Sequence, residues 1–452
     1  MLFRSMIFDT AWAHQRDVLP TLIARNHLLL WDPGTGKTLP LLAAAAARGG
    51  RCLYLLPPSV RTQVAREAVR FGLFDPEDVQ VVLRNADRVS LAAKLVVCSY
   101  EQCHTPALWR QLFALDWATL VCDEAHLLKN GETRRARAVY GARINSPGAL
   151  ARKAERVLLA TGTPVVNDPS DLWMHISRVF PAVLEELSIK SRAEWVDRYC
   201  ATRQTPYGLQ VTGGKNLPEL ARVLKRIASR VRKDAVHDLP PLIVDQHWVP
   251  PTDIDLADVP DEAMAALAEL LAAERPDTEQ LARLAVPLAS LRRRIGLAKA
   301  AHVAELVAGE LRGGVAKALV FYEHKDVAAA FLQAFKPRKG WGAAQYSGGL
   351  TPAQRDKAVA EFSTDPTCRL LLAQIQAAGT GLNLQAAERV VLLEPAWTPA
   401  LNEQAISRAY RAGQTRKTHA SYVCLEKSVD ERIVGAIVRK TRVIAGVLDD
   451  RE

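Results

Sequence analysis

The chain has 452 residues, of which 49% are hydrophobic and 24% are charged. This length exceeds one ordinary core and the composition is that of a globular protein, so we expect two or three domains and exclude an extended disordered chain. The formal net charge of +10 favours a polyanionic partner, with nucleic acid the first choice, although a basic protein without such a partner has the same charge.

The sequence also indicates in which cellular compartment the protein is expected. No apolar run approaches membrane-spanning length, and Arg4 and Asp9 interrupt any signal-peptide core, so we expect no membrane partner. The seven cysteines are scattered without a CxxC pair, which favours reduced, buried thiols over a zinc site. These features predict a soluble, cytoplasmic protein.

Short apolar strands alternate with helical stretches up to about residue 180, and this alternation predicts an α/β fold with a parallel sheet. The strands expected there are 28–31, 52–56, 79–83, 95–99, 119–123 and 156–160. Residues 181–235 are predicted to be helical and basic. A second α/β rhythm begins near residue 317, with expected strands at 318–322, 343–346, 369–373, 389–393 and 420–425.

We therefore predict two parallel-sheet lobes with helical insertions between them. The first lobe is expected to cover residues 1–238 and to include a helical protrusion at about 181–235. A linker and a second helical protrusion follow at 239–300, and the second lobe covers 301–452 with a long final helix from about residue 429.

The first candidate site follows the first strand. Residues 32–36 form a glycine-containing turn, and Lys37 and Thr38 open an Ala- and Leu-rich helix. Backbone N–H groups and the positive end of the helix dipole then face a phosphate, Lys37 reaches its terminal oxygens and the Thr38 hydroxyl ligates Mg²⁺. Trp31 stands where the strict pattern has glycine, and a plain glycine-rich turn before a helix is the alternative.

The strand expected over 119–123 ends in two neighbouring carboxylates, Asp123 and Glu124. Parallel sheets place ligands at such strand ends. Asp123 suits the binding of Mg²⁺ through water, and Glu124 suits the orientation and deprotonation of an attacking water. A solvated turn is the alternative. Thr161, Gly162 and Thr163, at another strand end, are expected either to hydrogen-bond the carboxylate pair or to sense the γ-phosphate, and a simple strand-to-loop turn is the alternative.

The second lobe carries a glycine loop over 376–384 and two arginines, Arg408 and Arg411, on a helix predicted over 399–412. Residues three apart share one helix face, and two guanidinium groups on one face suit a phosphate. If the lobes meet, these arginines reach a γ-phosphate held by the first lobe. A solvated basic helix face is the alternative.

In this order the motifs resemble those of superfamily II helicase-like ATPases, and within them the Snf family of double-stranded DNA translocases. The stretches that carry the resemblance are 14–15, 55–60, 98–101, 123–130, 161–167, 321–324, 379–384, 394–399 and 404–414. Residues 212–220, 230–240 and 294–299 resemble the annealing-helicase branch in particular. Trp31 and residues 33–35 depart from the usual Snf pattern, and one hypothesis is that Trp31 packs against the adjoining lobe or the nucleotide's edge.

The resemblance implies two RecA-like lobes of the P-loop NTPase type, with ATP and Mg²⁺ as cofactors. It implies a nucleotide site formed by Gln15, Gly34, Thr35, Gly36, Lys37, Thr38, Asp123, Gly381 and Gln404, with Mg²⁺ held by Thr38 and Asp123. It assigns catalysis to Lys37, Glu124, Arg408 and Arg411. The candidate nucleic-acid contacts are Ser59, Ser99, Tyr100, Lys129, His324, Lys325, Thr380 and Asn383, each of which also fits a structural role in a turn or cap.

The function expected on this basis is ATP-dependent translocation on duplex or forked DNA by a monomer that remodels forks, anneals strands or removes bound proteins. Its contacts with DNA are expected to be sequence-tolerant. One alternative is an ATP-driven protein remodeler that resembles the bacterial ATPase recycling RNA polymerase, and another is a non-catalytic nucleic-acid-binding module. Replication or transcription proteins are further candidate partners. The Ala/Arg-rich composition and the lack of a visible appended module suit a bacterial or phage protein.

Overall fold

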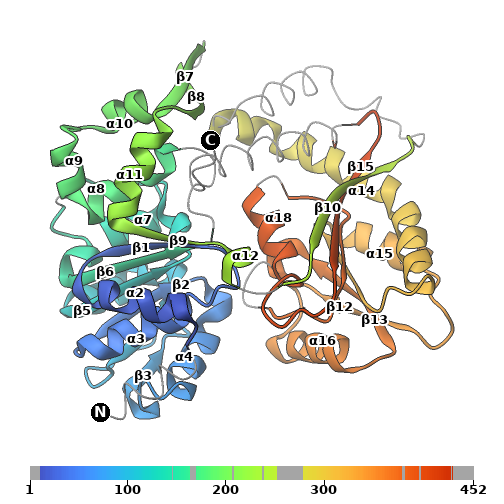
Figure 1. Cartoon of the computed structure of the whole chain (residues 1–452), viewed down its shortest axis with the longest axis horizontal. Coiled ribbons are helices and arrows are strands. Elements are labelled where there is room, and N and C mark those ends of the chain that lie inside the picture. Colours follow the sequence, from blue (N-terminus) through green and yellow to red (C-terminus); the bar gives the residue numbers. More distant parts are fainter. Residues whose placement is uncertain are drawn as a thin grey trace. The chain divides into compact units, whose positions relative to one another are not determined.

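The structure is a computed structural model, and it describes residues 11–144, 146–162, 169–205, 208–236, 239–251, 278–378, 382–396, 399–428 and 430. The chain forms two compact units, shown in Figure 1. Unit 1 contains residues 1–201, 213–236 and 444–452, and unit 2 contains residues 202–212 and 237–443. The finer division into two lobes and a separate linker stays a prediction.

Unit 1 is built on a seven-stranded sheet in the order β3-β4-β2-β5-β6-β1-β9, and its described strand pairs are all parallel. The strands are β1 (His27–Trp31), β2 (Cys52–Leu56), β3 (Val79–Val81), β4 (Leu95–Ser99), β5 (Trp117–Asp123), β6 (Ala154–Thr161) and β9 (Ala228–Val231). The first six confirm the predicted strands. β9 was not predicted, because it lies in a stretch that was expected to be helical and becomes a strand by pairing with β1.

Helices and short 3₁₀ segments (η) connect the strands of unit 1. They are α2 (Ala13–Ala24), α3 (Thr38–Arg48), η1 (Pro58–Val60), α4 (Arg61–Arg70), η2 (Pro76–Asp78), α5 (Tyr100–Cys103), α6 (Pro106–Phe113), η3 (Ala125–Leu128), α7 (Arg134–Tyr140), η4 (Leu150–Lys153), η5 (Pro169–Leu172), α8 (Trp173–Val179), α9 (Pro181–Glu186), α10 (Arg192–Tyr199), α11 (Leu217–Ile227) and α12 (Lys233–Val236). A separate two-stranded sheet joins β7 (Cys200–Thr205) and β8 (Gly208–Gly214), so the stretch predicted as a helical protrusion contains strands as well.

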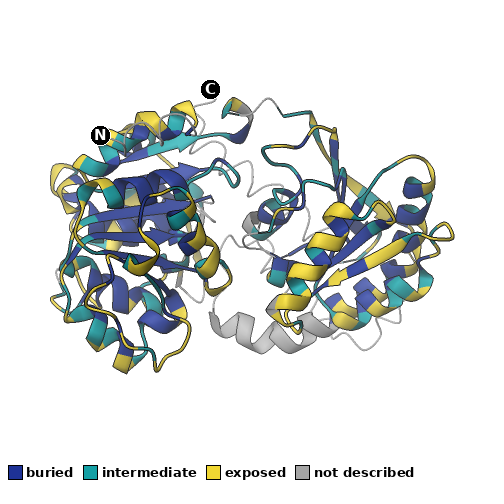
Figure 2. Ribbon diagram, turned by 90° about the horizontal axis from the view of Figure 1, so that it is seen from below, coloured by how far each residue is buried: buried dark blue, intermediate teal, exposed yellow. Residues whose placement is uncertain are grey.

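Alternate residues of β1 enter two different cores, one on each face of the sheet. Leu29 and Trp31 pack with apolar residues of α2, α3 and α4. Leu28 and Leu30 join the core that also contains residues of α6, α7 and α8. Every residue of β1 is therefore buried, as the dark central strands of Figure 2 show. This burial explains why the strand reads as a continuous apolar run and not as an alternating one.

Unit 2 has a six-stranded sheet in the order β10-β15-β14-β11-β13-β12, again with parallel pairing throughout its described strands. The strands are β10 (Leu242–Val249), β11 (Ala318–Tyr322), β12 (Gly342–Tyr346), β13 (Cys368–Gln374), β14 (Arg389–Leu392) and β15 (Thr418–Leu425). The helices are α14 (Thr278–Arg312), α15 (Lys325–Ala334), α16 (Pro352–Thr364), α17 (Ile375–Ala378) and α18 (Pro399–Ile406).

The five strands predicted for the second lobe are confirmed, and β10, which falls in the predicted linker, is an edge strand of the same sheet. The predicted final helix and the first part of the second helical protrusion lie outside the described residues. All seven cysteines are buried and none forms a disulfide, as the sequence predicts. None of the described helices combines the length and apolarity needed to cross a membrane.

His27 gives the fold a measurable dependence on pH. It is 3% exposed at the start of β1, and neither ring nitrogen has a hydrogen-bond partner among the described residues. Burial, with a smaller contribution from Arg25, lowers its pKa to about 4. The folded state therefore binds fewer protons than the unfolded state between about pH 4 and 6.5, and the unfolding free energy should fall as the pH drops through this window.

Between pH 7.5 and pH 5 we expect His27 to lower the unfolding free energy by about 2 kcal/mol, and by about 3 kcal/mol once the pH lies below the folded pKa. His27→Leu should remove that part of the pH dependence, because leucine fits the apolar strand and carries no proton. Urea unfolding monitored at pH 7.5 and pH 5 measures the effect, with His104→Leu, at a partly exposed position, as the control. An unchanged pH dependence in His27→Leu would contradict this account.

Candidate functional site

The loop between β1 and α3 has a backbone that only glycine fits at two positions. Gly34 and Gly36 have φ values of 89° and 73°, a region that L side chains rarely adopt. A Cβ added to Gly36 would lie 2.3 Å from Nε2 of Gln15. Lys37 caps the N-terminus of the eleven-residue helix α3, which begins at Thr38. The loop and the helix N-terminus together form the arrangement that binds phosphate groups.

The Lys37 ammonium lies at the carboxyl ends of two neighbouring strands. Its Nζ donates to the carbonyl oxygens of Trp31, at 3.0 Å, and of Asp32, at 3.4 Å. A Cβ built on Gly162, just after β6, would lie 3.2 Å from the same Nζ. The positive charge is thus placed beside the loop, where a terminal phosphate would meet it.

Gln15 and His14 attach the start of α2 to this loop. Gln15 donates from Nε2 to the Gly36 carbonyl at 2.9 Å and accepts from the Trp12 backbone N–H at 2.8 Å. His14 Nε2 lies 2.9 Å from the carbonyl oxygen of Thr35. Two loop residues of the predicted nucleotide site, Thr35 and Gly36, are therefore held by α2. The contact of Gln15 with adenine stays a prediction.

Trp31 is a core residue of unit 1. Its side chain is fully buried, its Nε1 donates to the Ser229 hydroxyl at 3.0 Å and its ring meets His14 edge to face. These contacts replace the hypothesis that Trp31 packs against the adjoining lobe or the nucleotide. A bulky residue fits here because β9 and α2 enclose this end of β1.

Asp123 ends β5, where two donors hold its buried carboxylate and a third holds its backbone carbonyl. Oδ1 accepts from the Glu124 backbone N–H at 2.9 Å, and Oδ2 accepts from the Tyr54 hydroxyl at 3.2 Å. The Tyr100 hydroxyl donates to the Asp123 carbonyl at 2.7 Å. Burial and then the charge of Glu124 raise the pKa of Asp123, while Lys37, the Glu124 N–H and Tyr54 oppose this rise.

Glu124 adopts the left-handed backbone conformation, with φ 52° and ψ 47°, which is uncommon outside glycine. This turn directs the side chain to His126, whose Nδ1 lies 3.2 Å from Glu124 Oε2 and 3.1 Å from Thr161 Oγ1. The predicted link between Thr161 and the carboxylate pair therefore runs through His126, for which the sequence analysis had no role. Thr163 lies outside the described residues.

These residues fit a Mg²⁺-bound polyphosphate. The part of the chain that the structure describes has no group of three or more His, Cys, Asp or Glu side chains able to hold a metal alone. Mg²⁺ does not need such a group, because one or two protein oxygens combine with phosphate oxygens and water. Asp123 supplies a buried carboxylate, and Thr38 supplies a hydroxyl at the helix start.

In unit 2 the prediction that Arg408 and Arg411 share a helix face is wrong. α18 ends at Ile406, and the two arginines lie in the turns that follow it. The buried Gln414 fixes these turns by donating to the carbonyls of Ala387, at 2.8 Å, and of Ala409, at 3.2 Å.

Further contacts hold the two arginines to the segment before β14. The Leu384 backbone N–H donates to the Arg408 carbonyl at 2.9 Å, and Arg411 Nη1 donates to the Leu382 carbonyl at 3.1 Å. Gln404 is buried on α18, and Gly381 and Thr380 lie outside the described residues. The turn backbone, rather than a helix, therefore fixes where the two arginines lie.

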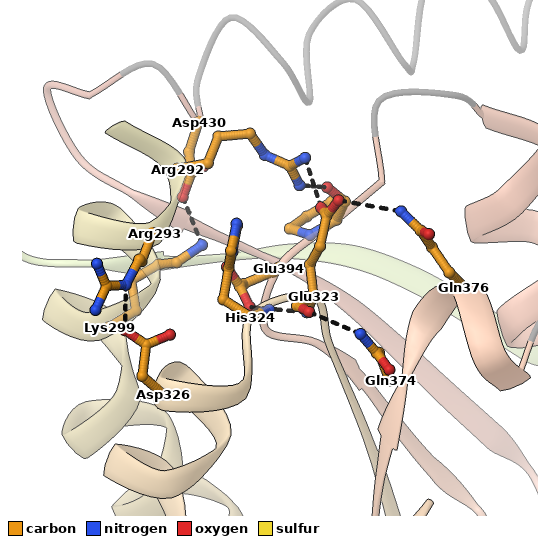
Figure 3. A network of polar contacts seen from close by, with 11 residues as sticks. Arg292, Arg293, Lys299, Glu323, His324, Asp326, Gln374, Gln376, Glu394 and Asp430 are labelled. Carbon is orange, nitrogen blue, oxygen red and sulfur yellow. Dashed lines mark hydrogen bonds and ion pairs between the residues drawn. The ribbon is translucent and has the colours of Figure 1, made fainter. Parts of the chain in front are cut away.

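His324 belongs to a polar network at the strand ends of unit 2, drawn in Figure 3. The buried Glu394 accepts from His324 Nδ1 at 2.7 Å and from the backbone N–H groups of Glu323 and His324. This hydrogen bond raises the pKa of His324, although burial opposes it. Arg292 on α14 pairs with Glu323 at 2.6 Å and donates to the Pro395 carbonyl. The network thus joins the ends of β11 and β14 to α14.

The remaining candidate nucleic-acid contacts divide by exposure. Ser59, Lys325 and Asn383 are exposed. Ser99 and Tyr100 are buried, Ser99 as the cap of α5 and Tyr100 on the Asp123 carbonyl. Their placement favours a structural role. The other contacts stay predictions.

Two family models match the chain in succession. A model described as the SNF2-related domain matches residues 54–257, and a model described as the helicase conserved C-terminal domain matches residues 298–413. The chain belongs to the SNF2 family of helicase-like ATPases.

Two relatives are similar to the chain over most of its length. "DNA annealing helicase and endonuclease ZRANB3" of Mus musculus is 26% identical over 433 residues, 93% of this chain and 39% of that protein. "SWI/SNF-related matrix-associated actin-dependent regulator of chromatin subfamily A-like protein 1" of Xenopus laevis is 27% identical over 448 residues, 97% of this chain and 44% of that protein. The chain thus spans about two fifths of the length of these relatives.

The structure "Sulfolobus solfataricus SWI2/SNF2 ATPase core in complex with dsDNA" is 20% identical, covers 97% of each chain and gives a TM-score of 0.44. At this TM-score the likeness carries no argument.

Lys129 has a structural partner that its predicted contact with nucleic acid did not anticipate. Its Nζ lies 3.1 Å from Oδ2 of Asp171, whose side chain is 2% exposed, whereas the Lys129 side chain is 26% exposed. Lys129→Met should lower the unfolding free energy by about 2 kcal/mol, less than the roughly 3–5 kcal/mol of a fully buried pair. Urea unfolding measures this loss.

The double variant Lys129→Met/Asp171→Asn should regain most of that stability, because it leaves no unpaired buried charge. We expect it to bind duplex DNA as tightly as the unmodified chain in a fluorescence anisotropy titration. Weakened binding with restored stability would instead show that Lys129 contacts nucleic acid.

Proposed function

We propose that the chain is a DNA-dependent ATPase that translocates on duplex DNA and remodels forks or anneals strands. The observation that carries the proposal is the placement of the Asp123 and Glu124 carboxylates at the end of β5, in the same sheet as the Lys37 loop. This arrangement supplies a phosphate cradle, a cation ligand and a base. Family membership supports ATP as the nucleotide, with Mg²⁺ as its usual companion.

Each residue has a defined task in this proposal. The loop N–H groups and Lys37 bind and orient the phosphates, and Thr38 and Asp123 hold Mg²⁺. When bound, Mg²⁺ neutralises the developing charge on the phosphates. Glu124 orients the attacking water and takes its proton. His126 contacts both Glu124 and Thr161, and so holds the Glu124 side chain beside the end of β6.

Arg408 and Arg411 are proposed to act on the γ-phosphate, as the resemblance of residues 404–414 implies. An arginine placed there contributes roughly 10³–10⁵ in rate in related phosphoryl-transfer enzymes. Gln15, Gln404 and Gly381 are proposed to complete the nucleotide site.

Duplex or forked DNA is proposed as the partner for two reasons. The net charge of +10 favours a polyanion, and the names of the relatives include annealing-helicase activity. Because phosphate contacts carry no sequence information, such binding should be sequence-tolerant and weaken with salt. Ser59, His324, Lys325, Thr380 and Asn383 remain the proposed contacts.

The proposal is tested by the ATPase rate with and without duplex DNA, measured by phosphate release. We expect duplex DNA to stimulate the rate, and Glu124→Gln to lower the stimulated rate by about 10²–10⁴-fold while ATP still binds. Lys37→Ala should lose ATP binding as well. Glu185→Gln, at an exposed position on α9, is the matched control.

Two outcomes would contradict the proposal. A rate that no duplex or forked DNA stimulates would favour an ATP-driven protein remodeler. Unmodified turnover in Glu124→Gln would show that another group is the base.

A further inference from the structure

We propose that Arg230 is a positioning residue of the phosphate loop, which neutralises the Asp32 carboxylate so that the loop accepts a polyphosphate. This inference rests on the proposed function, because it concerns the same nucleotide site. Arg230 and Asp32 are 198 residues apart in the chain. The sequence indicates Asp32 only as part of the turn over 32–36, and Arg230 only as part of the stretch 230–240.

The phosphate loop contains a negative charge, on Asp32, that opposes the binding of phosphate. Asp32 directly follows β1 and precedes the two glycines of the cradle. Its carbonyl oxygen accepts from the Thr35 hydroxyl at 2.8 Å and lies 3.4 Å from Lys37 Nζ. A negative side chain at this position repels the phosphates of ATP unless a positive group compensates it.

Arg230 and its neighbours hold both oxygens of that carboxylate. Arg230 Nη1 pairs with Asp32 Oδ1, and the Lys233 backbone N–H donates to Asp32 Oδ2 at 3.0 Å. The side chains of the ion pair are 24% and 29% exposed. The pair is therefore shielded from water on most of its surface, and its attraction is stronger than that of a surface pair.

Strand pairing fixes the guanidinium group in this place. β9 pairs with β1 in parallel, so that Arg230 lies opposite Leu30. Arg230 Nη1 also donates to the Leu30 carbonyl at 2.9 Å, and the Asp32 backbone N–H donates to the Val231 carbonyl at 3.0 Å. The bond from Trp31 to Ser229 adds a second link between the two strands. The loop thus depends on β9 for both its backbone position and its charge balance.

A double-mutant cycle tests the inference, with the dissociation constant of Mg–ATP measured by isothermal titration calorimetry on the full chain. We expect Arg230→Gln to weaken binding at least tenfold, because it leaves the Asp32 carboxylate uncompensated. The double variant Arg230→Gln/Asp32→Asn should bind Mg–ATP at least fivefold more tightly than Arg230→Gln, since the charge that Arg230 neutralises is then absent. Asp32→Asn alone completes the cycle.

Two further variants separate positioning from mere stability. Arg230→Lys keeps the positive charge, so it should bind ATP more tightly than Arg230→Gln. If Arg230→Gln folds poorly, the affinity of Arg230→Lys is compared with that of the unmodified chain instead. Arg226 on α11 forms an exposed ion pair with Glu186, and Arg226→Gln, which removes this arginine, serves as the control. Thermal unfolding of each variant shows whether affinity follows stability.

Three results would overturn the inference. Equal affinity in Arg230→Gln and the unmodified chain would show that the pair does not affect the loop. A double variant that binds as weakly as Arg230→Gln would show that Arg230 touches the phosphates or acts through the fold alone. An unmodified chain that binds no Mg–ATP would refute the proposed function together with this inference, whereas the first two results leave the proposed function intact.

Discussion

Parallel strand pairing in unit 1 places the carboxyl ends of neighbouring strands at one edge of the sheet, and the candidate site depends on this constraint. β5, β6 and β1 are adjacent in the sheet. Their ends carry the Asp123 and Glu124 carboxylates, Thr161 and the phosphate loop, respectively. Residues that are far apart in the sequence, such as Lys37 and Gly162, are therefore brought close together. The central strands are buried on both faces, which keeps this edge rigid.

A buried carboxylate at this edge needs compensation, and the structure supplies it from three elements. Tyr54 on β2 and the Glu124 N–H donate to the Asp123 carboxylate, and Lys37 at the start of α3 contributes positive charge. Tyr100 holds the backbone of the same residue. Asp32 presents the same problem in the loop, where Arg230 compensates it from β9. Both acidic groups are thus balanced by side chains that belong to other strands or to their ends.

The sequence predicts most of the fold because the central strands are buried on both faces and read as short apolar runs between turn residues. β9 escapes this rule, since its four residues include Arg230 and become a strand only beside β1. The position at which α18 ends could not be predicted from the sequence either. Residues 399–412 are compatible with one helix, but Gln414 and the Leu384 N–H hold the segment after Ile406 in turns.

The candidate site shows the same division. Lys37, Asp123 and Glu124 can be named as candidates from the sequence, because local spacing after a strand indicates their chemistry. Tyr54, His126 and Arg230 are not found, because their roles arise from contacts between strands that the linear pattern does not contain. Trp31 departs from the loop pattern in the sequence, and its packing against His14 and Ser229 explains why the position accepts it.

We propose that the buried Asp123 carboxylate has to be ionised for ATP hydrolysis, because it holds Mg²⁺ in that form. The test is the acid limb of the ATPase pH profile in Tyr54→Phe. Tyr140→Phe, which removes another buried hydroxyl from unit 1, is the control. Because the Tyr54 hydrogen bond lowers the pKa of Asp123, its removal should move the midpoint of the acid limb to higher pH. A midpoint that stays in place or moves to lower pH in Tyr54→Phe would contradict the account.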